Sequence, residues 1–239
     1  MDNAVVKKQG EPLKKVGTTD ISALIKQLKK TKMFDQLCLL VLDASGSMRN
    51  LLEDGNTKTI ATKTAVIDLI SILKKSTKSS GFHLGIVCYD TVPQIRLHVQ
   101  PIDSVKESKI DWGEEFGNGA YTRIDLALTE AEKMADAFLK SGEPESNNKR
   151  DARILLMSDG YCNEPEKTRE VVTHFKDTHG DKLRFCCCLL AHTDEQDLEL
   201  AESLMKEIAS TDKSGKLCFT RVSNGKDLRS FFEGSSTDE

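Results

Sequence analysis

Apolar residues occur along this chain in short continuous runs separated by segments long enough to form helices. The run Leu37–Leu42 (LCLLVL) is apolar at every position, which is typical of a strand buried on both faces of a sheet. Such runs predict strands at 37–42, 83–89, 94–99, 153–158, 183–190 and 216–221. The segments between and after them predict helices at about 58–75, 122–139, 165–178, 195–210 and 225–233.

The alternation of strands and helices predicts a doubly wound α/β fold. Right-handed helical crossovers join consecutive strands into a mostly parallel sheet with helices on both faces. The segment at 94–99 is the exception, because only Asp90–Pro93 separate it from the preceding strand. Four residues are too few for a crossover, so we expect 94–99 to be an antiparallel edge strand.

The chain divides into four parts. Residues 1–17 show no hydrophobic period and indicate a flexible basic leader. Residues 18–33 predict a short amphipathic helix, because apolar residues recur at helical spacing after a Thr-Asp cap. Residues 34–233 predict one α/β domain with a solvated loop at 140–151, and 234–239 a frayed tail.

Composition narrows the functional classes. Hydrophobic residues make up 38% of the 239 residues and charged residues 30%, and no apolar run approaches the roughly 20 residues of a transmembrane helix. The formal net charge is −4, with a net +5 in residues 1–32 and an acidic remainder. We therefore expect no membrane span. Because the chain is acidic overall and its aromatic content is only 5%, we expect no nucleic-acid partner either.

The seven cysteines indicate a reducing compartment. Their number is odd, their spacing is irregular and most lie inside apolar runs, so we expect reduced thiols rather than a disulfide framework. In the run Cys186–Cys188 consecutive strand residues point to opposite faces, which disfavours a shared metal. With no secretory signal at the start of the sequence, we expect a cytoplasmic protein.

Hard oxygen donors follow three of the predicted elements. Asp43, Ser45 and Ser47 come directly after the first strand, Asp159 follows the strand at 153–158, and Thr122 opens the predicted helix at 122–139. In open α/β sheets ligands bind beyond the carboxyl ends of the strands. Three hydroxyls and two carboxylates at that edge suit Mg²⁺ or Mn²⁺ rather than zinc, for which Cys and His would be expected.

The turn Asp43-Ala44-Ser45-Gly46-Ser47 resembles the metal-ion-dependent adhesion site of von Willebrand factor A domains. Thr122 and Asp159-Gly160 match further positions of that site in the same order, and the order of elements matches over residues 34–233. One departure is Ala120-Tyr121, where many members of the family have Gly-Gly. The resemblance implies that residues 34–233 form a von Willebrand A-like domain.

The resemblance also implies a function. In that family the two serines and the threonine contact the metal, the aspartates act largely through water, and a Glu or Asp of a partner protein completes the coordination. We therefore expect an intracellular binding or scaffold module that is not an enzyme. Two loops, Arg49–Thr57 and Asp111–Tyr121, flank the site. Acidic residues in these loops should repel a generally acidic partner and favour one with a single prominent carboxylate in a neutral or basic surface; they include Glu53, Asp54, Glu114 and Glu115.

Three other interpretations stay open at this stage. The Asp-Ser-Ser turn could simply cap a helix without metal. Asp43 after the first strand is also reminiscent of aspartyl phosphohydrolases, although Ser45 stands where those enzymes have a general acid. A domain of this fold could also bind its partner without using the metal.

Overall fold

The computed structural model describes residues 35–113, 116–141, 150–191 and 198–236. The predicted leader at 1–17 and helix at 18–33 lie outside these ranges. The strands are β1 (Asp35–Asp43), β2 (Phe82–Tyr89), β3 (Pro93–Pro101), β4 (Arg150–Ser158), β5 (Leu183–Leu190) and β6 (Phe219–Val222). The helices are α2 (Lys58–Lys75), α3 (Ile124–Lys140), α4 (Pro165–His179), α5 (Glu199–Ile208) and α6 (Gly225–Ser236).

The six strands form one sheet in the order β3-β2-β1-β4-β5-β6. All neighbouring pairs are parallel except β2 and β3, which are antiparallel. The strand order therefore reverses direction beside β1, which is where ligands bind in doubly wound sheets. The predicted α/β class, the mostly parallel sheet and the antiparallel edge strand are confirmed.

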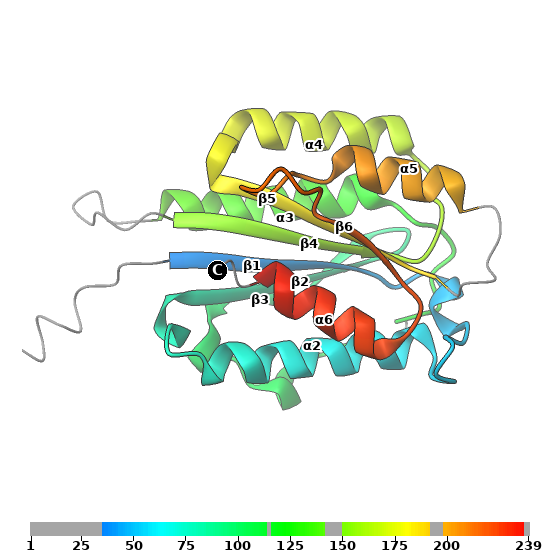
Figure 1. The fold of residues 1–239 in the computed structure, drawn as a ribbon, viewed down its shortest axis with the longest axis horizontal. Helices are drawn as coiled ribbons and strands as arrows, with labels where there is room; N and C mark the ends of the chain where they lie inside the picture. Colours follow the sequence, from blue (N-terminus) through cyan, green and yellow to red (C-terminus); the bar gives the residue numbers. More distant parts are fainter. Residues whose placement is uncertain (1–34, 114–115, 142–149, 192–197, 237–239) are drawn as a thin grey trace, which may run out of the picture. The chain divides into compact units, whose positions relative to one another are not determined.

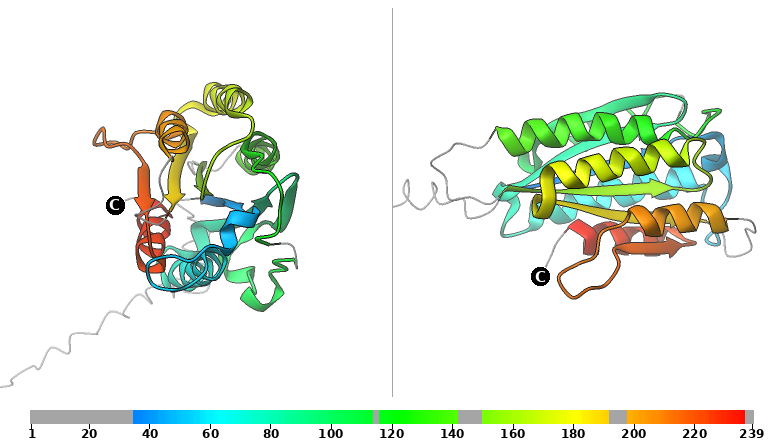
Figure 2. Two further views of the ribbon diagram at one scale, coloured as in Figure 1. Left: turned by 90° about the vertical axis from the view of Figure 1, so that its right-hand side faces the viewer. Right: turned by 90° about the horizontal axis from the view of Figure 1, so that it is seen from above.

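Helices cover both faces of the sheet (Figures 1 and 2). On one face α2 and α6 pack over the even-numbered residues of β1, including Leu40 and Leu42. On the other face α3, α4 and α5 pack over its odd-numbered residues, including Leu39 and Val41. Successive residues of a strand point to opposite faces, and this is why β1 is apolar at every position from Leu37 to Leu42.

The same alternation places the consecutive cysteines of β5 on opposite faces of the sheet. Cys186 and Cys188 lie in the core beneath α2 and α6, whereas Cys187 lies in the core beneath α3 to α5. The prediction that consecutive thiols point to opposite faces is confirmed. The run therefore contributes to both cores.

The element boundaries differ from the predicted ones at functionally relevant ends. The α3 helix begins at Ile124, so Thr122 lies in the preceding loop rather than in the helix. The α6 helix continues to Ser236, into the segment predicted to be frayed. Side chains from the sheet hold this end: Gln36 Nε2 donates to the Ser236 carbonyl at 2.8 Å, and Arg153 Nη1 to the Ser235 carbonyl at 2.9 Å.

The carboxyl ends of the parallel strands lie on the right in Figure 1, and the left view of Figure 2 looks onto this edge. The loops after β1, β2 and β4 gather there. Among the described residues, no helix has the length and apolar character needed to cross a membrane.

Candidate functional site

The turn after β1 is organised by its aspartate. Asp43 is fully buried, and its Oδ1 accepts a hydrogen bond from the backbone N–H of Ser45 at 2.8 Å. Its Oδ2 accepts from the Ser158 hydroxyl at 3.0 Å. The register of β1 and β4 puts Leu42 beside Met157, so Asp43 and Ser158 are neighbours at the ends of their strands. Ser158 is a site residue that the sequence pattern did not reveal.

Asp159 meets both serines of the turn across more than 110 residues of sequence. Its Oδ1 accepts from Ser47 Oγ at 2.8 Å and from Ser45 Oγ at 3.5 Å, and the two hydroxyl oxygens lie 2.9 Å apart. Ser45 and Asp159 are buried, whereas Ser47 is exposed. This group of oxygens therefore opens to solvent on the Ser47 side.

Thr122 is positioned by a residue that the sequence pattern did not single out. The backbone N–H of Thr122 donates to Asn163 Oδ1 at 2.7 Å, and the backbone N–H of Asn163 donates to the Thr122 carbonyl at 3.1 Å. These two bonds fasten the Thr122 loop to the loop that follows Asp159. Within the described chain, no hydrogen bond joins the Thr122 hydroxyl to the other four predicted residues.

The loop before Thr122 also lies against the serine turn. The backbone N–H of Gly46 donates to the Gly119 carbonyl at 2.8 Å, and the N–H of Gly117 donates to the Ala44 carbonyl at 2.9 Å. A Cβ on Gly46 would lie 3.2 Å from the Gly119 carbonyl, and one on Gly119 would lie 2.1 Å from the Asp90 side chain. The φ of Gly46 is not positive, so a left-handed backbone conformation is not what requires glycine here. Its absent side chain instead permits this close approach.

The two buried carboxylates, Asp43 and Asp159, repel each other when both are ionised. Burial raises the pKa of Asp43 from 3.8 to about 7, and the nearby charge of Asp159 acts in the same direction, against hydrogen bonds from Ser45 and Ser158 that lower it. Burial penalises the ionised form because it removes water from the carboxylate. A cation placed here would relieve this penalty.

A lysine ammonium already provides part of that compensation. Lys58, the first residue of α2, is only 1% exposed, and its Nζ lies 3.3 Å from Asp159 Oδ2. Thr57 caps the same helix end by accepting from the Ile60 N–H at 3.2 Å. The sequence does not mark Lys58 as a site residue, because a lysine at a helix start usually extends into solvent.

The donor set fits a hard divalent cation. Three hydroxyls and two carboxylates are at the sheet edge, and the oxygens of Ser45, Ser47 and Asp159 are within hydrogen-bonding distance of one another. Mg²⁺ and Mn²⁺ prefer oxygen ligands and readily keep bound water. Among the described residues, no group of three or more His, Cys, Asp or Glu side chains is placed to hold a metal.

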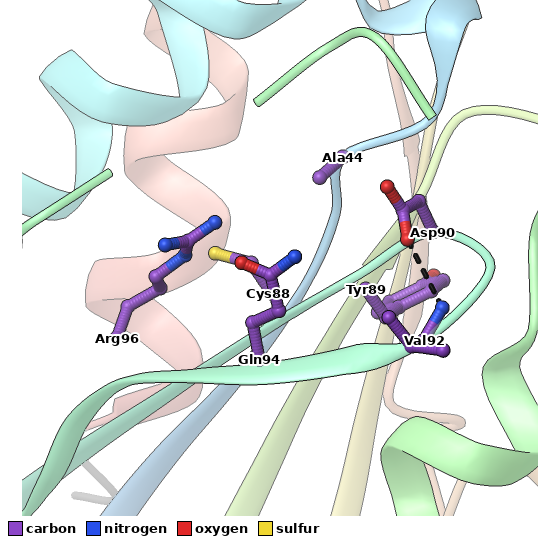
Figure 3. Close-up of a pocket in the computed structure, with 7 residues that line it drawn as sticks. All are labelled: Ala44, Cys88, Tyr89, Asp90, Val92, Gln94 and Arg96. Carbon is purple, nitrogen blue, oxygen red and sulfur yellow. Dashed lines mark hydrogen bonds between the residues drawn. The ribbon is translucent and has the colours of Figure 1, made fainter. Parts of the chain in front are cut away.

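A small pocket lies next to the serine turn between β1, β2 and β3 (Figure 3). It is lined by Ala44, Cys88, Asp90 and Arg96, among others, and its volume of about 10 Å³ admits a single water. Asp90 Oδ1 accepts from the Val92 N–H at 3.0 Å on its wall. The pocket is too small to hold an organic substrate.

Exposed apolar side chains surround this edge of the sheet. Of the seven large hydrophobic side chains that are exposed in the described chain, six lie in carboxyl-edge loops or in the first turn of the helix that follows; the exception is Ile67. Four of the six are in the loops themselves, and we call them the apolar collar: Leu51, Val92, Tyr121 and Tyr161. Their exposed fractions range from 46% to 60%.

Residues of the two loops that flank the site, 49–57 and 111–121, make contacts with the rest of the domain. Asp54 Oδ2 accepts from the Gly225 N–H at 2.9 Å, which joins this loop to the start of α6. Trp112 packs against the core and meets Phe116 edge-on at 5.6 Å, with Lys63 above both rings. Glu114 and Glu115 lie outside the described residues.

Comparisons with known proteins support the fold. A pilus adhesin, SpaC from Lactobacillus rhamnosus GG, superposes with a TM-score of 0.64 at 12% identity, covering 85% of this chain and 30% of its own. The PilB minor pilin from Streptococcus sanguinis gives 0.63 at 12% identity, covering 84% and 60%. Proximal thread matrix protein 1 from the mussel byssus, in a structure whose adhesion-site motif is occupied by zinc, gives 0.58 at 13% identity, covering 84% and 46%.

This chain has a von Willebrand A-like fold. No protein-family model matches the sequence, and no curated protein matches it either. The chain spans between 30% and 60% of the length of these structural neighbours. At 10–14% identity the neighbours establish the fold and not the activity.

Proposed function

We propose that this protein is a metal-dependent protein-binding module. The observation that carries the proposal is the meeting of Ser45, Ser47 and Asp159 oxygens at one point of the carboxyl edge, from strands far apart in sequence. Together with Asp43 and Thr122 they would hold one Mg²⁺ or Mn²⁺. The adhesin and matrix-protein character of the structural neighbours supports an adhesion-type role.

The partner contact would be a carboxylate. A divalent cation held here would offer a coordination position to an incoming hard oxygen. Because three of the five candidate ligands are neutral hydroxyls, the protein neutralises less of the cation's charge than a carboxylate cage would. A Glu or Asp side chain of a partner would be preferred to an amide at that position for the same reason.

The surroundings of the site support a protein as the partner. Clustered exposed apolar side chains mark interaction surfaces, and the apolar collar frames the site at the same edge. We propose a partner whose carboxylate stands among apolar side chains. This refines the expectation of a neutral or basic surface.

An enzymatic role is less well supported. A phosphohydrolase of the aspartyl type needs a general acid two residues after its nucleophile, but that position is Ser45, whose hydroxyl is engaged with Ser47 and Asp159. The neighbouring structures are adhesins, pilins and a matrix protein. We therefore propose that the protein is not an enzyme.

We also propose a reducing, cytoplasmic location. None of the seven cysteines, all of which lie in the described ranges, forms a disulfide. Burial raises the pKa of Cys38, Cys88 and Cys187 to about 12, so these three remain unreactive thiols.

Titration calorimetry with Mn²⁺ tests the metal site. One binding site is expected, and Asp159→Ala and Asp43→Ala should each weaken binding by about tenfold or more, since each removes a charged oxygen. Asp68→Ala, which removes a carboxylate on α2 away from the strand ends, is the matched control. Unchanged Mn²⁺ affinity in both site variants would refute the assignment.

The partner interaction is tested by capture with Mg²⁺ and with EDTA, followed by a change of the partner's candidate Glu to Gln. Loss of binding with EDTA and with Gln supports the metal-bridged contact. Tyr121→Ser and Tyr161→Ser should weaken partner binding but not Mn²⁺ binding, with Ile67→Ser as the control. Equal affinity with and without metal would favour the metal-independent interface.

A further inference from the structure

Arg49 lies beside the serine turn and is not one of the candidate metal ligands. It is the last residue of the 3₁₀ helix Gly46–Arg49, which directly follows Ser45. Side chains three residues apart in a 3₁₀ helix eclipse one another, so the Arg49 side chain extends past the position of Gly46. A Cβ built on Gly46 would lie 3.8 Å from Arg49 Nη2. The guanidinium is therefore next to the backbone that joins Ser45 to Ser47.

Contacts on two sides position the base of this side chain. The backbone N–H of Asn50 donates to the Ser47 carbonyl at 2.9 Å, which closes the turn around Arg49. The Arg49 stem also lies against the loop before Thr122, because a Cβ built on Gly117 would be 3.6 Å from Arg49 Cγ. The side chain thus leaves the backbone at a defined place between the serine turn and this loop.

The guanidinium of Arg49 is available to a ligand. Arg49 is exposed, and within the described chain it forms no ion pair. Arg123, by contrast, is paired with Asp125 at 2.7 Å. Ser47, the candidate ligand on the solvent side of the site, is exposed as well. A positive charge with hydrogen-bond donors therefore stands where a partner would approach a cation bound at the site.

We infer that Arg49 binds the second oxygen of the partner's carboxylate and so determines which partner group the site accepts. This inference rests on the proposed function. A carboxylate that places one oxygen on the cation beside Ser47 keeps its other oxygen as a hydrogen-bond acceptor. The Arg49 guanidinium presents planar N–H donors that match a carboxylate, and such charge-assisted bonds are stronger than neutral ones. The contact favours a carboxylate over an amide and adds affinity beyond that of the metal.

The test measures acetate binding to the Mn²⁺-loaded protein. Mn²⁺ is titrated calorimetrically into the wild type, Arg49→Met and Lys75→Met at several acetate concentrations and constant ionic strength. Lys75, an exposed cation at the opposite end of α2, is the matched control. Acetate should bind loaded Arg49→Met about threefold to fivefold more weakly than the loaded wild type, and Lys75→Met should not differ. Equal acetate affinity in Arg49→Met and the wild type would overturn the inference.

Mn²⁺ affinity without acetate separates this outcome from a failure of the proposed function. Arg49→Met should bind Mn²⁺ at least as tightly as the wild type, because the substitution removes a neighbouring positive charge and no metal ligand. Weaker Mn²⁺ binding by Arg49→Met would show that Arg49 supports the metal site itself, and would overturn the inference. If the wild type binds no Mn²⁺ at all, the proposed metal site fails, which is a distinct outcome.

Carbon NMR supplies a second readout with the same probe. Mn²⁺ held by the wild type should broaden the carboxyl resonance of acetate, and should broaden the carbonyl resonance of acetamide much less at the same concentration. Arg49→Met should reduce the acetate broadening and leave the acetamide broadening unchanged. Equal broadening of the two probes by the wild-type protein would contradict the selection of a carboxylate.

Discussion

At the scale of single residues, the site depends on carboxylates that are buried before any ligand arrives. Asp43 is fully buried, and both of its oxygens accept hydrogen bonds from the protein. Its chief role in the structure is to shape the serine turn. Asp159 is the carboxylate that accepts hydrogen bonds from the hydroxyls of the serine turn, those of Ser45 and Ser47.

The raised pKa of Asp43 predicts a pH-dependent stability in EDTA. Between pH 3.8 and about 7 the folded protein binds more protons than the unfolded chain, so the free energy of unfolding falls as the pH rises through this window. The amide introduced by Asp43→Asn does not titrate. The stability of this variant relative to wild type should therefore improve between about pH 5 and about pH 8, by up to roughly 3 kcal/mol.

Urea unfolding of both proteins at the two pH values measures this difference. Subtracting the variant–wild-type difference at one pH from that at the other cancels the pH-independent cost of replacing one hydrogen-bond acceptor by an amide donor. The same stability difference at both pH values would mean that Asp43 titrates near its ordinary value.

At the scale of elements, the loop before Thr122 is held against the serine turn by backbone hydrogen bonds of Gly117 and Gly119. Gly119→Ala should destabilise the protein by about 1–3 kcal/mol, because the added Cβ would meet the Asp90 side chain at 2.1 Å. Gly160→Ala is the matched control: a Cβ there would have no described heavy atom within 4 Å, and its φ is not positive. Urea unfolding that shows equal losses for the two variants would contradict this account.

Asn163 is expected to act on the site by positioning Thr122. Asn163→Ala removes the acceptor for the Thr122 N–H, so Mn²⁺ affinity should fall by about tenfold, the equivalent of one hydrogen bond of roughly 1.4 kcal/mol. Asn163→Asp keeps an acceptor oxygen and should restore most of the affinity. An Asn163→Ala variant with wild-type Mn²⁺ binding would show that Asn163 does not position Thr122.

At the scale of the whole molecule, the sheet separates two hydrophobic cores, and the candidate metal ligands lie at the carboxyl edge of the sheet. The α2 and α6 helices cover one face, and α3, α4 and α5 cover the other. The cysteines follow this division, and five of the seven are buried.

Thiol titration checks the redox state across the molecule. Denatured, non-reduced protein should show seven thiols. In the native protein only Cys162 and Cys218, which are half-buried, should react quickly, because burial slows the other five. Five or fewer thiols in freshly denatured protein would indicate a native disulfide and contradict a reducing compartment.

The sequence by itself determined the fold class. Continuous apolar runs such as the one in β1 can be satisfied only by a sheet covered on both faces, and the short connection between β2 and β3 permits only a hairpin. The sequence also indicated the oxygen donors Asp43, Ser45, Ser47 and Asp159, since strand ends in a parallel sheet share one edge.

Only the tertiary structure decided which groups complete the site. Ser158, Asn163 and Lys58 carry no local pattern that marks them, because their partners lie on other strands and loops: Asp43, Thr122 and Asp159. Hydrophobic periodicity reports which face of an element is buried, not which polar side chain meets which across the sheet edge. A lysine at a helix start looks solvated in the sequence, and only the packing of α2 against the ends of β1 and β4 turns it into the buried counter-ion of Asp159.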